Sequence, residues 1–367
     1  MRISTTLSVY VGKHFLMAFL ACFGIFLAVV MLFDSIELLR RAASRPDVSF
    51  TDVVQMAALR LPHLGQEMFP FAVLFGGMSA FWRLARTHEL VVTRAAGVSA
   101  WQFLFPVLLL AGLLGAFHVT VFNPLASTLL TRFERLEAIY LKGQSSTLAV
   151  SPTGLWLRQS NSLGQSVVHA TSVLQQQTDV ELRDVIVFVY EGQSKFLERI
   201  DAAYARLEDG FWYMKEVRIQ RPEEGSNYFE EFWLETDLTL SRIQDSFAPP
   251  ETMSFWTLSD FIDNLEAAGF SAVRHRLHFN TLMASPLLMC AMVLIAATFT
   301  LRQSSRRGGT TFIIAAGVLT GFLLYFFSDV VYALGLSDSI PVTLAAWTPS
   351  GVATLLGLGM LLHLEDG

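Results

Sequence analysis

Three arginines, Arg40, Arg41 and Arg45, follow soon after a run of 19 residues without a charged side chain. Guanidinium groups bind phosphate and carboxylate through paired hydrogen bonds, so this spacing predicts an anion-binding site at the end of a membrane helix. Two other interpretations use the same residues. Long basic side chains reach the lipid headgroups from helix ends, and Asp34 or Glu37 could pair with the arginines one turn along a helix.

Other chemistry finds little support in the sequence. The Gly12-Lys13 pair is followed by His14 and precedes an apolar run, so it is not a phosphate-binding loop. There is no HExxH zinc-protease motif and no GxSxG elbow. His275 and His278 could form a metal pair, but the remaining ligands are missing, and we interpret both as polar residues beside the membrane. We therefore expect no catalytic residue, metal or bound cofactor.

Composition indicates a membrane protein. Hydrophobic residues make up 53% of the chain and charged residues only 16%, against roughly 25% in soluble domains. The net charge of −6 is spread over the chain and predicts no nucleic-acid partner. Cys22 and Cys290 lie in apolar runs and cannot form a disulfide in a polar domain. The first apolar run is too long for a signal peptide and is followed by charges, which predicts an uncleaved helix.

Six stretches are apolar and long enough to cross a bilayer, since about 20 residues suffice. The second contains Glu67, and a re-entrant segment is the alternative there. The predicted spans are Phe15–Phe33, Leu61–Trp82, Trp101–Phe122, Leu277–Leu301, Gly308–Ser328 and Ser339–Leu364.

The distribution of Lys and Arg in short loops predicts the orientation, because cytoplasmic loops are richer in both. With the N-terminus in the cytoplasm, eight basic residues lie inside and four outside. The eight are Arg2, Lys13, Arg83, Arg86, Arg94, Arg302, Arg306 and Arg307; the four are Arg40, Arg41, Arg45 and Arg60. Both termini are therefore expected in the cytoplasm.

The segment between the third and fourth spans has a different composition. Its start, Leu125–Leu141, has helical spacing and should extend the third span. Short β-branched and aromatic runs separated by turn residues then predict a β-sandwich or jelly roll outside the cytoplasm. The predicted strands are Leu155–Arg158, Ser166–Leu174, Val185–Tyr190, Arg199–Leu207, Phe211–Gln220 and Tyr228–Leu234, and a short helix is predicted over Thr257–Ala268.

This pattern gives a helical membrane protein with six transmembrane helices and an extracytoplasmic β-jelly-roll domain inserted between helices 3 and 4. Three parts are expected: residues 1–124 with the first three helices, residues 125–276 with the β domain, and residues 277–367 with the last three helices.

The short loop between the second and third spans, residues 82–97, has a helical pattern and ends at Gly97. It is either an interfacial helix lying on the membrane or a coupling helix that docks onto a cytoplasmic ATPase. The residue pattern alone does not decide between the two.

Three stretches resemble the LptF/LptG family of lipopolysaccharide-export permeases. They are Phe69–Gly97, with Phe-Pro-Phe-Ala-Val-Leu-Phe-Gly-Gly and the basic loop after it; Arg276–Thr300; and Gly317–Gly351, with Ala-Ala-Trp-Thr-Pro-Ser. The similarity extends over essentially the whole chain. Phe-Asp-Ser-Ile-Glu-Leu-Leu-Arg-Arg after the first span is more similar to the LptG branch.

This resemblance implies an inner-membrane permease subunit without catalytic activity of its own. Its expected partners are a sister six-helix LptF-type subunit, an LptB-type ATPase dimer that binds ATP, a periplasmic LptC/LptA-type bridge protein, and lipopolysaccharide. It would extract the lipid from the inner membrane and pass it to the bridge.

The resemblance also assigns residues. Arg40, Arg41 and Arg135 match basic positions that face the phosphates of the lipid, and Arg45 lies near them, whereas Asp34 departs from the pattern. Glu89 matches the acidic residue of the coupling helix. Its expected neighbours in the ATPase contact are Arg86, Leu90 and Arg94.

Other classes of protein fit less well. A mechanotransmission subunit of another ABC system usually has four spans. A lipid-handling secondary transporter would need polar residues in mid-membrane and internal repeats, and the spans offer only His118 and Glu67. A membrane enzyme acting on lipid would need a catalytic constellation.

Overall fold

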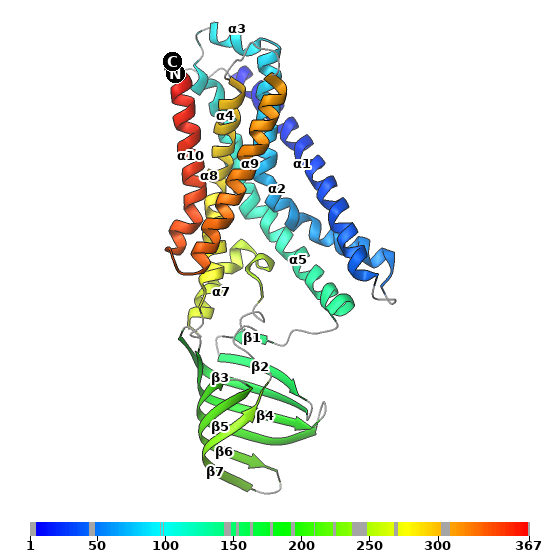
Figure 1. Ribbon diagram of the computed structural model, residues 1–367, viewed down its shortest axis with the longest axis vertical. Helices are drawn as coiled ribbons and strands as arrows, with labels where there is room; N and C mark the ends of the chain where they lie inside the picture. Colours follow the sequence, from blue (N-terminus) through cyan, green and yellow to red (C-terminus); the bar gives the residue numbers. More distant parts are fainter. Residues whose placement is uncertain are drawn as a thin grey trace. The chain divides into compact units, whose positions relative to one another are not determined.

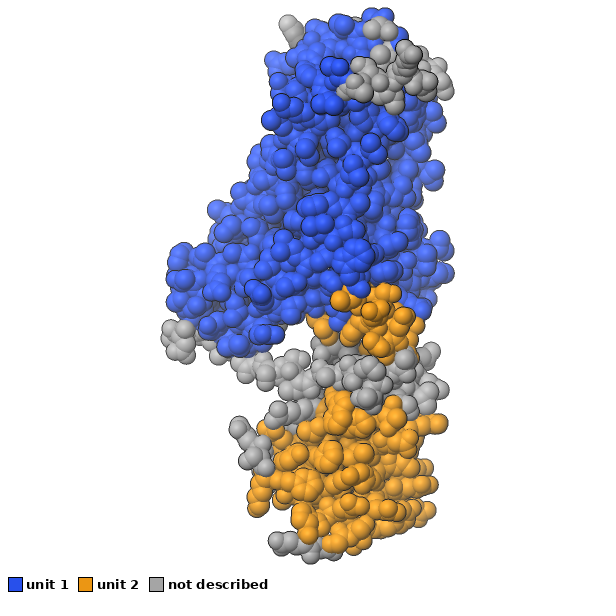
Figure 2. Space-filling view, turned by 180° about the vertical axis from the view of Figure 1, so that it is seen from behind, with its two compact units in different colours: residues 1–142, 251–256, 276–367 blue, residues 143–250, 257–275 orange. Residues whose placement is uncertain are grey.

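The computed structural model describes most of the 367 residues. The described ranges are 5–43, 48–95, 97, 99–142, 148–151, 154–161, 164–176, 179–191, 195–208, 210–222, 225–236, 248–267, 271–301 and 309–365. The chain divides into two compact units, which Figure 2 colours separately. The helical unit contains residues 1–142, 251–256 and 276–367, and the β unit contains residues 143–250 and 257–275.

Six helices of the helical unit are long and apolar enough to cross a membrane, as predicted. The helices of the chain are α1 (Thr5–Ala42), α2 (Phe50–Arg86), α3 (Glu89–Ala95), α4 (Ala100–Phe117), α5 (Asn123–Glu137), α7 (Phe255–Ala267), α8 (Val273–Leu301), α9 (Gly309–Leu336) and α10 (Val342–Glu365) (Figure 1). A 3-10 turn, η3 (Pro250–Thr252), precedes α7.

The second helix is much longer than the apolar stretch that predicted it. It begins at Phe50 because Ser49 and Asp52 form a capping box, in which the Ser49 hydroxyl accepts from the Asp52 N–H and the Asp52 carboxylate accepts from the Ser49 N–H. Pro62 and Pro70 lie inside the helix without ending it, and neighbouring helices support such prolines in membranes. The second span is therefore a full helix and not a re-entrant segment.

The third span is a long helix whose winding changes twice. Residues His118–Phe122 form a π-helix, η1, between α4 and α5, and Ala138–Lys142 form a second one, η2. The cause of η1 is Pro124, which has no N–H to donate to the carbonyl of Thr120 four residues before it. The Asn123 N–H instead donates to the His118 carbonyl, five residues back.

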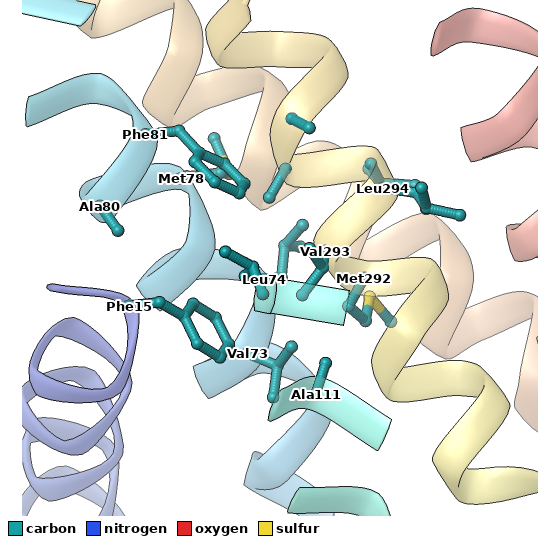
Figure 3. Packing of buried hydrophobic residues seen from close by; sticks show 14 of the residues in the cluster. Phe15, Val73, Leu74, Met78, Ala80, Phe81, Ala111, Met292, Val293 and Leu294 are labelled. Atoms are coloured by element: carbon teal, nitrogen blue, oxygen red, sulfur yellow. The ribbon is translucent and has the colours of Figure 1, made fainter. Parts of the chain in front are cut away.

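The core of the helical unit surrounds α2. Side chains of α1, α2, α4 and α8 interlock there; Figure 3 shows Phe15 of α1 and Phe81 of α2 turned toward this core, with Val293 of α8 across from them. Two helix backbones approach closely at Gly76 of α2. A Cβ at this position would lie 2.7 Å from the Cα and 2.8 Å from the N of Phe19 on α1.

The β unit contains a single antiparallel sheet of seven described strands. They are β1 (Leu148–Ser151), β2 (Gly154–Asn161), β3 (Gly164–Gln176), β4 (Asp179–Glu191), β5 (Lys195–Glu208), β6 (Phe211–Arg221) and β7 (Gly225–Glu235), and each pairs with the next one along the chain. All six predicted strands are present, and β1 is additional. A jelly roll made of Greek keys would pair non-consecutive strands. Connections of two or three residues favour hairpins instead.

One face of this sheet forms the core of the β unit. Trp212, Met214, Leu182 and Ile200 are fully buried there, and they alternate with exposed residues as a half-buried sheet requires. The predicted helix at residues 257–268 is present as α7, but it begins at Phe255, so the Ser259-Asp260 pair lies inside it and does not cap it.

The close approach of the α1 backbone to Gly76 gives a direct test of the packing between α1 and α2. In Gly76→Ala the new methyl group meets the backbone of Phe19, which cannot move away without separating the two helices. We expect a loss of about 2 kcal/mol of stability, typical of overpacking, measured as a lower melting temperature of the purified protein. In the control Gly24→Ala the new Cβ has nothing within 4 Å, so stability should not fall. Equal melting temperatures for the two variants would contradict this packing.

Candidate functional site

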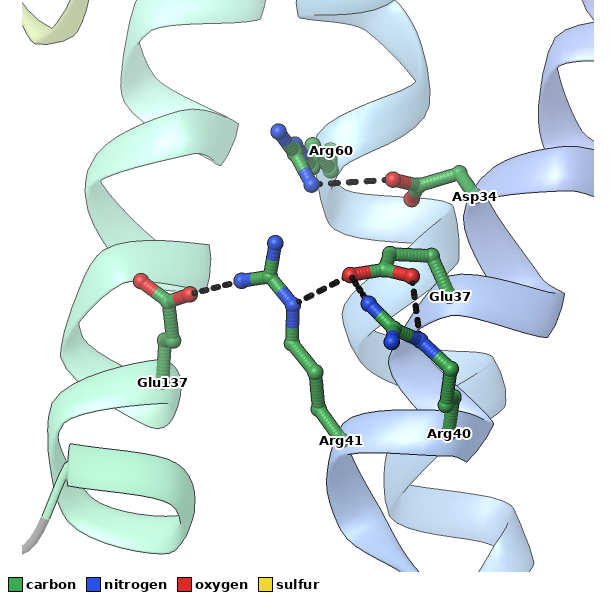
Figure 4. A network of polar contacts seen from close by, with 6 residues as sticks. All are labelled: Asp34, Glu37, Arg40, Arg41, Arg60 and Glu137. Atoms are coloured by element: carbon green, nitrogen blue, oxygen red, sulfur yellow. Dashed lines mark hydrogen bonds and ion pairs between the residues drawn. The ribbon is translucent and has the colours of Figure 1, made fainter.

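Six charged side chains gather where α1, α2 and α5 meet, near the C-terminal end of α1 (Figure 4). Three are carboxylates and three are guanidinium groups. The residues are Asp34, Glu37, Arg40 and Arg41 of α1, Arg60 of α2 and Glu137 of α5. We call this set the arginine–carboxylate cluster.

Glu37 is the shared acceptor of the two predicted arginines. Arg40 donates through Nε and Nη2 to the two Glu37 oxygens, both at 2.9 Å. Arg41 donates from Nε to Glu37 Oε1, also at 2.9 Å. The pairing along one helix that was an alternative from the sequence is thus present. The Arg40 side chain remains 76% exposed, so its guanidinium can still meet an incoming anion.

Arg41 also reaches across to α5. Its Nη1 lies 3.3 Å from Glu137 Oε1, and the Glu137 side chain is only 10% exposed. Because Glu37 and Glu137 both face Arg41, this arginine is held between two helices. An anion that binds Arg41 through Nε has to compete with Glu37.

A second ion pair joins Asp34 to Arg60, with Nη1 and Oδ1 2.9 Å apart. Asp34 is 8% exposed and its second oxygen has no hydrogen-bond partner among the described residues. The Arg60 guanidinium lies 5.3 Å from the ring centre of Phe133 on α5, a cation–π contact. Asp34, the residue that departs from the family pattern, therefore neutralises a basic side chain of the next helix.

Sequence reasoning named all of the α1 residues but missed Arg60 and Glu137 as members of the site. An acidic residue such as Asp34 near the end of an apolar run does signal a buried partner. The sequence separation of 26 residues between Asp34 and Arg60 gives no means of choosing that partner.

The other two predicted arginines are not part of the cluster. Arg135 is exposed on α5, and it lies two residues from Glu137, on a different face of that helix. It makes no ion pair among the described residues. Arg45 lies outside the described residues.

The predicted coupling region is a short helix set off from α2 by a sharp break. His88 has φ of 58°, a left-handed conformation, between the end of α2 at Arg86 and the start of α3 at Glu89. The Arg86 guanidinium lies over the Trp82 ring at 5.2 Å. The Glu89 carboxylate accepts a hydrogen bond from Tyr10 of α1. Leu90 and Arg94 belong to α3, but their side chains are outside the described part.

Two other polar regions can be compared with this cluster, the surroundings of His275 and a recess on the sheet. His275, one of the two histidines interpreted as polar residues beside the membrane, contacts the Ala248 carbonyl at 3.1 Å and packs on Phe261. Among the described residues no group of three His, Cys, Asp or Glu side chains could hold a metal.

The sheet has a shallow recess of about 560 Å³ lined by Tyr204, Arg206, Glu208, Tyr213, Lys215 and Trp233. The Tyr213 hydroxyl donates to Glu231 at 2.6 Å. That bond raises the pKa of Tyr213, because a phenolate would lie beside the carboxylate. Since acidic and basic side chains mix here, the recess has no preference for an anion.

Comparison with known proteins gives the family. The model of the family described as "Lipopolysaccharide export system permease LptF/LptG" matches residues 9–363. The chain belongs to this family. A Haemophilus influenzae relative named lipopolysaccharide export system permease protein LptG is 24% identical, over 94% of this chain and 95% of its own length. An Escherichia coli K12 protein of the same name is 24% identical, over 83% of this chain and 84% of its own length.

Both relatives carry the LptG name, so within the LptF/LptG family the chain is LptG-like, as the residues after the first span indicated. With its six membrane-length helices, it is a multi-pass inner-membrane permease of lipopolysaccharide export. The secondary-transporter and membrane-enzyme interpretations are thereby set aside.

The buried half of the cluster predicts a stability effect. Arg60→Ala leaves the Asp34 carboxylate buried without its partner, which should cost about 3 kcal/mol. Removing both charges in Arg60→Ala with Asp34→Asn should restore more than half of that loss. The measurement is thermal unfolding of the purified protein.

Arg135→Ala is the matched control, since this arginine is exposed and makes no ion pair in the described part of the chain. It should change stability by less than about 0.5 kcal/mol. If Arg60→Ala were as mild as this control, the Asp34–Arg60 pair would have no structural role.

Proposed function

We propose that the chain is the LptG-type permease subunit of an ATP-driven lipopolysaccharide exporter. It takes lipopolysaccharide from the inner membrane and passes it to a periplasmic bridge protein. The main support is the family match, which extends from residue 9 to 363. The helical unit also contains a cluster with three arginines, and a separate short helix, α3, follows α2.

The orientation we propose puts α3 in the cytoplasm. In Figure 1, α3 lies at the same end of the helical unit as the start of α1 and the end of α10. The excess of Lys and Arg in the short loops favours this end as the cytoplasmic one. The C-terminal end of α1, with Arg40 and Arg41, then lies at the periplasmic surface, and the β unit is periplasmic.

In this orientation the cluster binds the phosphate groups of lipopolysaccharide. Arg40 and Arg41 already hold a carboxylate through the geometry that suits a phosphate, two N–H groups to two oxygens. A phosphate has more charge than a carboxylate and accepts more hydrogen bonds, so it can displace Glu37. Arg45 and Arg135 would add basic charge around this site without sharing its ion pairs.

The acyl chains need an apolar surface. Exposed apolar side chains cover α1 and α9, among them Phe33, Ile36, Phe322 and Phe326. Such surfaces face lipid or another helix in a membrane. We propose that a sister LptF-type subunit completes a lipid-holding cavity here, and that the β unit receives the acyl chains on the apolar face of its sheet and meets an LptC/LptA-type bridge.

ATP hydrolysis belongs to a partner in this proposal. We assign Arg86 at the end of α2, and Glu89, Leu90 and Arg94 of α3, to the contact with an LptB-type ATPase dimer. Because α3 follows α2 directly, movement of the ATPase reaches the helix around which the core is packed. The chain itself needs no cofactor.

Competition between Glu37 and phosphate predicts the direction in which lipid crosslinking changes. Glu37→Gln removes the charge that competes for Arg40 and Arg41. It should raise photo-crosslinking of lipopolysaccharide to the arginine–carboxylate cluster by a few-fold. Arg40→Gln with Arg41→Gln should lower it several-fold, since the charge-assisted bonds are lost. Arg135→Gln, measured beside them, shows whether that arginine adds to binding. Lower crosslinking in Glu37→Gln would contradict phosphate exchange at this carboxylate.

The docking role of α3 is tested by charge reversal. Glu89→Lys should abolish co-purification of the ATPase with the permease, because a like charge replaces the expected acidic contact. Glu89 also accepts from Tyr10, so Tyr10→Phe is the control; it removes this internal bond and should leave the ATPase bound. Normal ATPase binding by Glu89→Lys would remove α3 from the interface.

A further inference from the structure

A tryptophan side chain donates to a backbone carbonyl of the π-helix η1. Pro124 cannot donate to the Thr120 carbonyl. The indole N–H of Trp256 does donate to it, with Nε1 3.2 Å from Thr120 O. A side chain 136 positions later in the sequence thus binds the backbone of a membrane helix at its irregular turn.

Two more hydrogen bonds attach the same segment to the third span. The Phe255 N–H donates to Asn123 Oδ1 at 2.8 Å, and Asn123 is fully buried. The Thr131 hydroxyl donates to the Thr252 carbonyl at 3.0 Å. Residues 251–256 belong to the helical unit, whereas α7 continues from Phe255 to Ala267 and so passes into the β unit. This short segment is hydrogen-bonded to the third span, and the chain continues from it in sequence into the β unit.

On its other side, η1 packs against α2 and α8. Phe69 of α2 contacts the rings of His118 and Phe122, with centroids 4.9 and 5.1 Å apart. His118 Nδ1 lies 3.4 Å from the Ser285 hydroxyl on α8. A movement of α2 therefore presses directly on the π-helix.

Buried polar atoms around η1 give it room to change its hydrogen bonds. Gln66 Oε1 of α2, His118 Nε2 and Asn123 Nδ2 are buried and have no hydrogen-bond partner among the described residues. Leaving a buried donor or acceptor unpaired is unfavourable. A change of winding that paired any of these atoms would therefore be favoured.

We infer that Trp256 and Asn123 are positioning residues for lipid transfer, which transmit movement of α2 through η1 to the β unit. This inference rests on the proposed function. It joins a packed, contiguous path from α3 through α2 and η1 to residues 255–256, with the π-turn as the element that we infer to change its winding. Loss of the Trp256 or Asn123 bond should leave ATP hydrolysis intact and uncouple it from lipid transfer.

The test uses the full-length chain in proteoliposomes with its sister subunit and ATPase, and a soluble bridge protein as lipid acceptor. Trp256→Phe keeps an exposed aromatic ring and removes only the indole donor. We expect an unchanged melting temperature, ATP hydrolysis within about twofold of the wild type, and lipid transferred per ATP lower by about fivefold, the scale of coupling through such networks. Asn123→Leu should act in the same direction, and Trp347→Phe, a partly exposed tryptophan of α10, should change nothing.

An unchanged ratio of lipid to ATP in Trp256→Phe would overturn the inference. So would a parallel loss of hydrolysis and transfer, which would mean that the contact only supports assembly. Failure of the proposed function gives a different result, because then the wild-type complex itself releases no lipid on ATP addition, whatever residue 256 is.

Discussion

A helix in hydrocarbon has to satisfy its own backbone hydrogen bonds, because no water is present to replace them. Prolines inside the helices remove one such donor each, among them Pro62 and Pro70 of α2, Pro286 of α8 and Pro124 of the third span. At Pro124 the Trp256 indole donates to the Thr120 carbonyl, and Asn123 accepts from the Phe255 N–H. The segment at the start of α7 is therefore attached to the third span at an irregular turn.

Charged side chains in the helical unit are likewise paired with one another. The arginine–carboxylate cluster contains equal numbers of basic and acidic groups, and its most buried member, Asp34, is matched by Arg60. Without the carboxylates, the three guanidinium groups would repel one another and would bind any anion. With Glu37 already in place, only a ligand with more charge or better geometry than a carboxylate can take its position. In the proposed function, this competition is what lets the site discriminate between a lipid phosphate and weaker anions.

The sequence allowed the large features to be predicted. Six apolar stretches identified the six long helices, and runs of β-branched and aromatic residues located six of the seven described strands. The length of α2 was underestimated, because apolar content marks the membrane-buried part of a helix and not its polar ends. The jelly roll stays a prediction, since strand runs alone do not show which neighbours pair.

The candidate site was predicted only in part for a related reason. Arg40, Arg41 and Glu37 lie within one turn of each other on one helix, and spacing reveals such pairs. Arg60 and Glu137 reach the site from other helices, and no local pattern encodes that meeting. The π-helix was not predicted, although Pro124 is in the sequence, because a proline near the predicted end of a span is ordinarily taken as a helix start.

The wide turn of η1 absorbs one extra residue, so the residues after it keep their rotational phase. Each residue turns a helix by about 100°. A chain shortened by one residue between His118 and Phe122 could wind without the wide turn and keep Leu130, Phe133 and Glu137 in the contacts they now make. A deletion between Pro124 and Leu130 has no wide turn to absorb it and would rotate these residues away, so it should be far less tolerable than a deletion in the hairpin loops of the sheet, where one residue less alters only a connection.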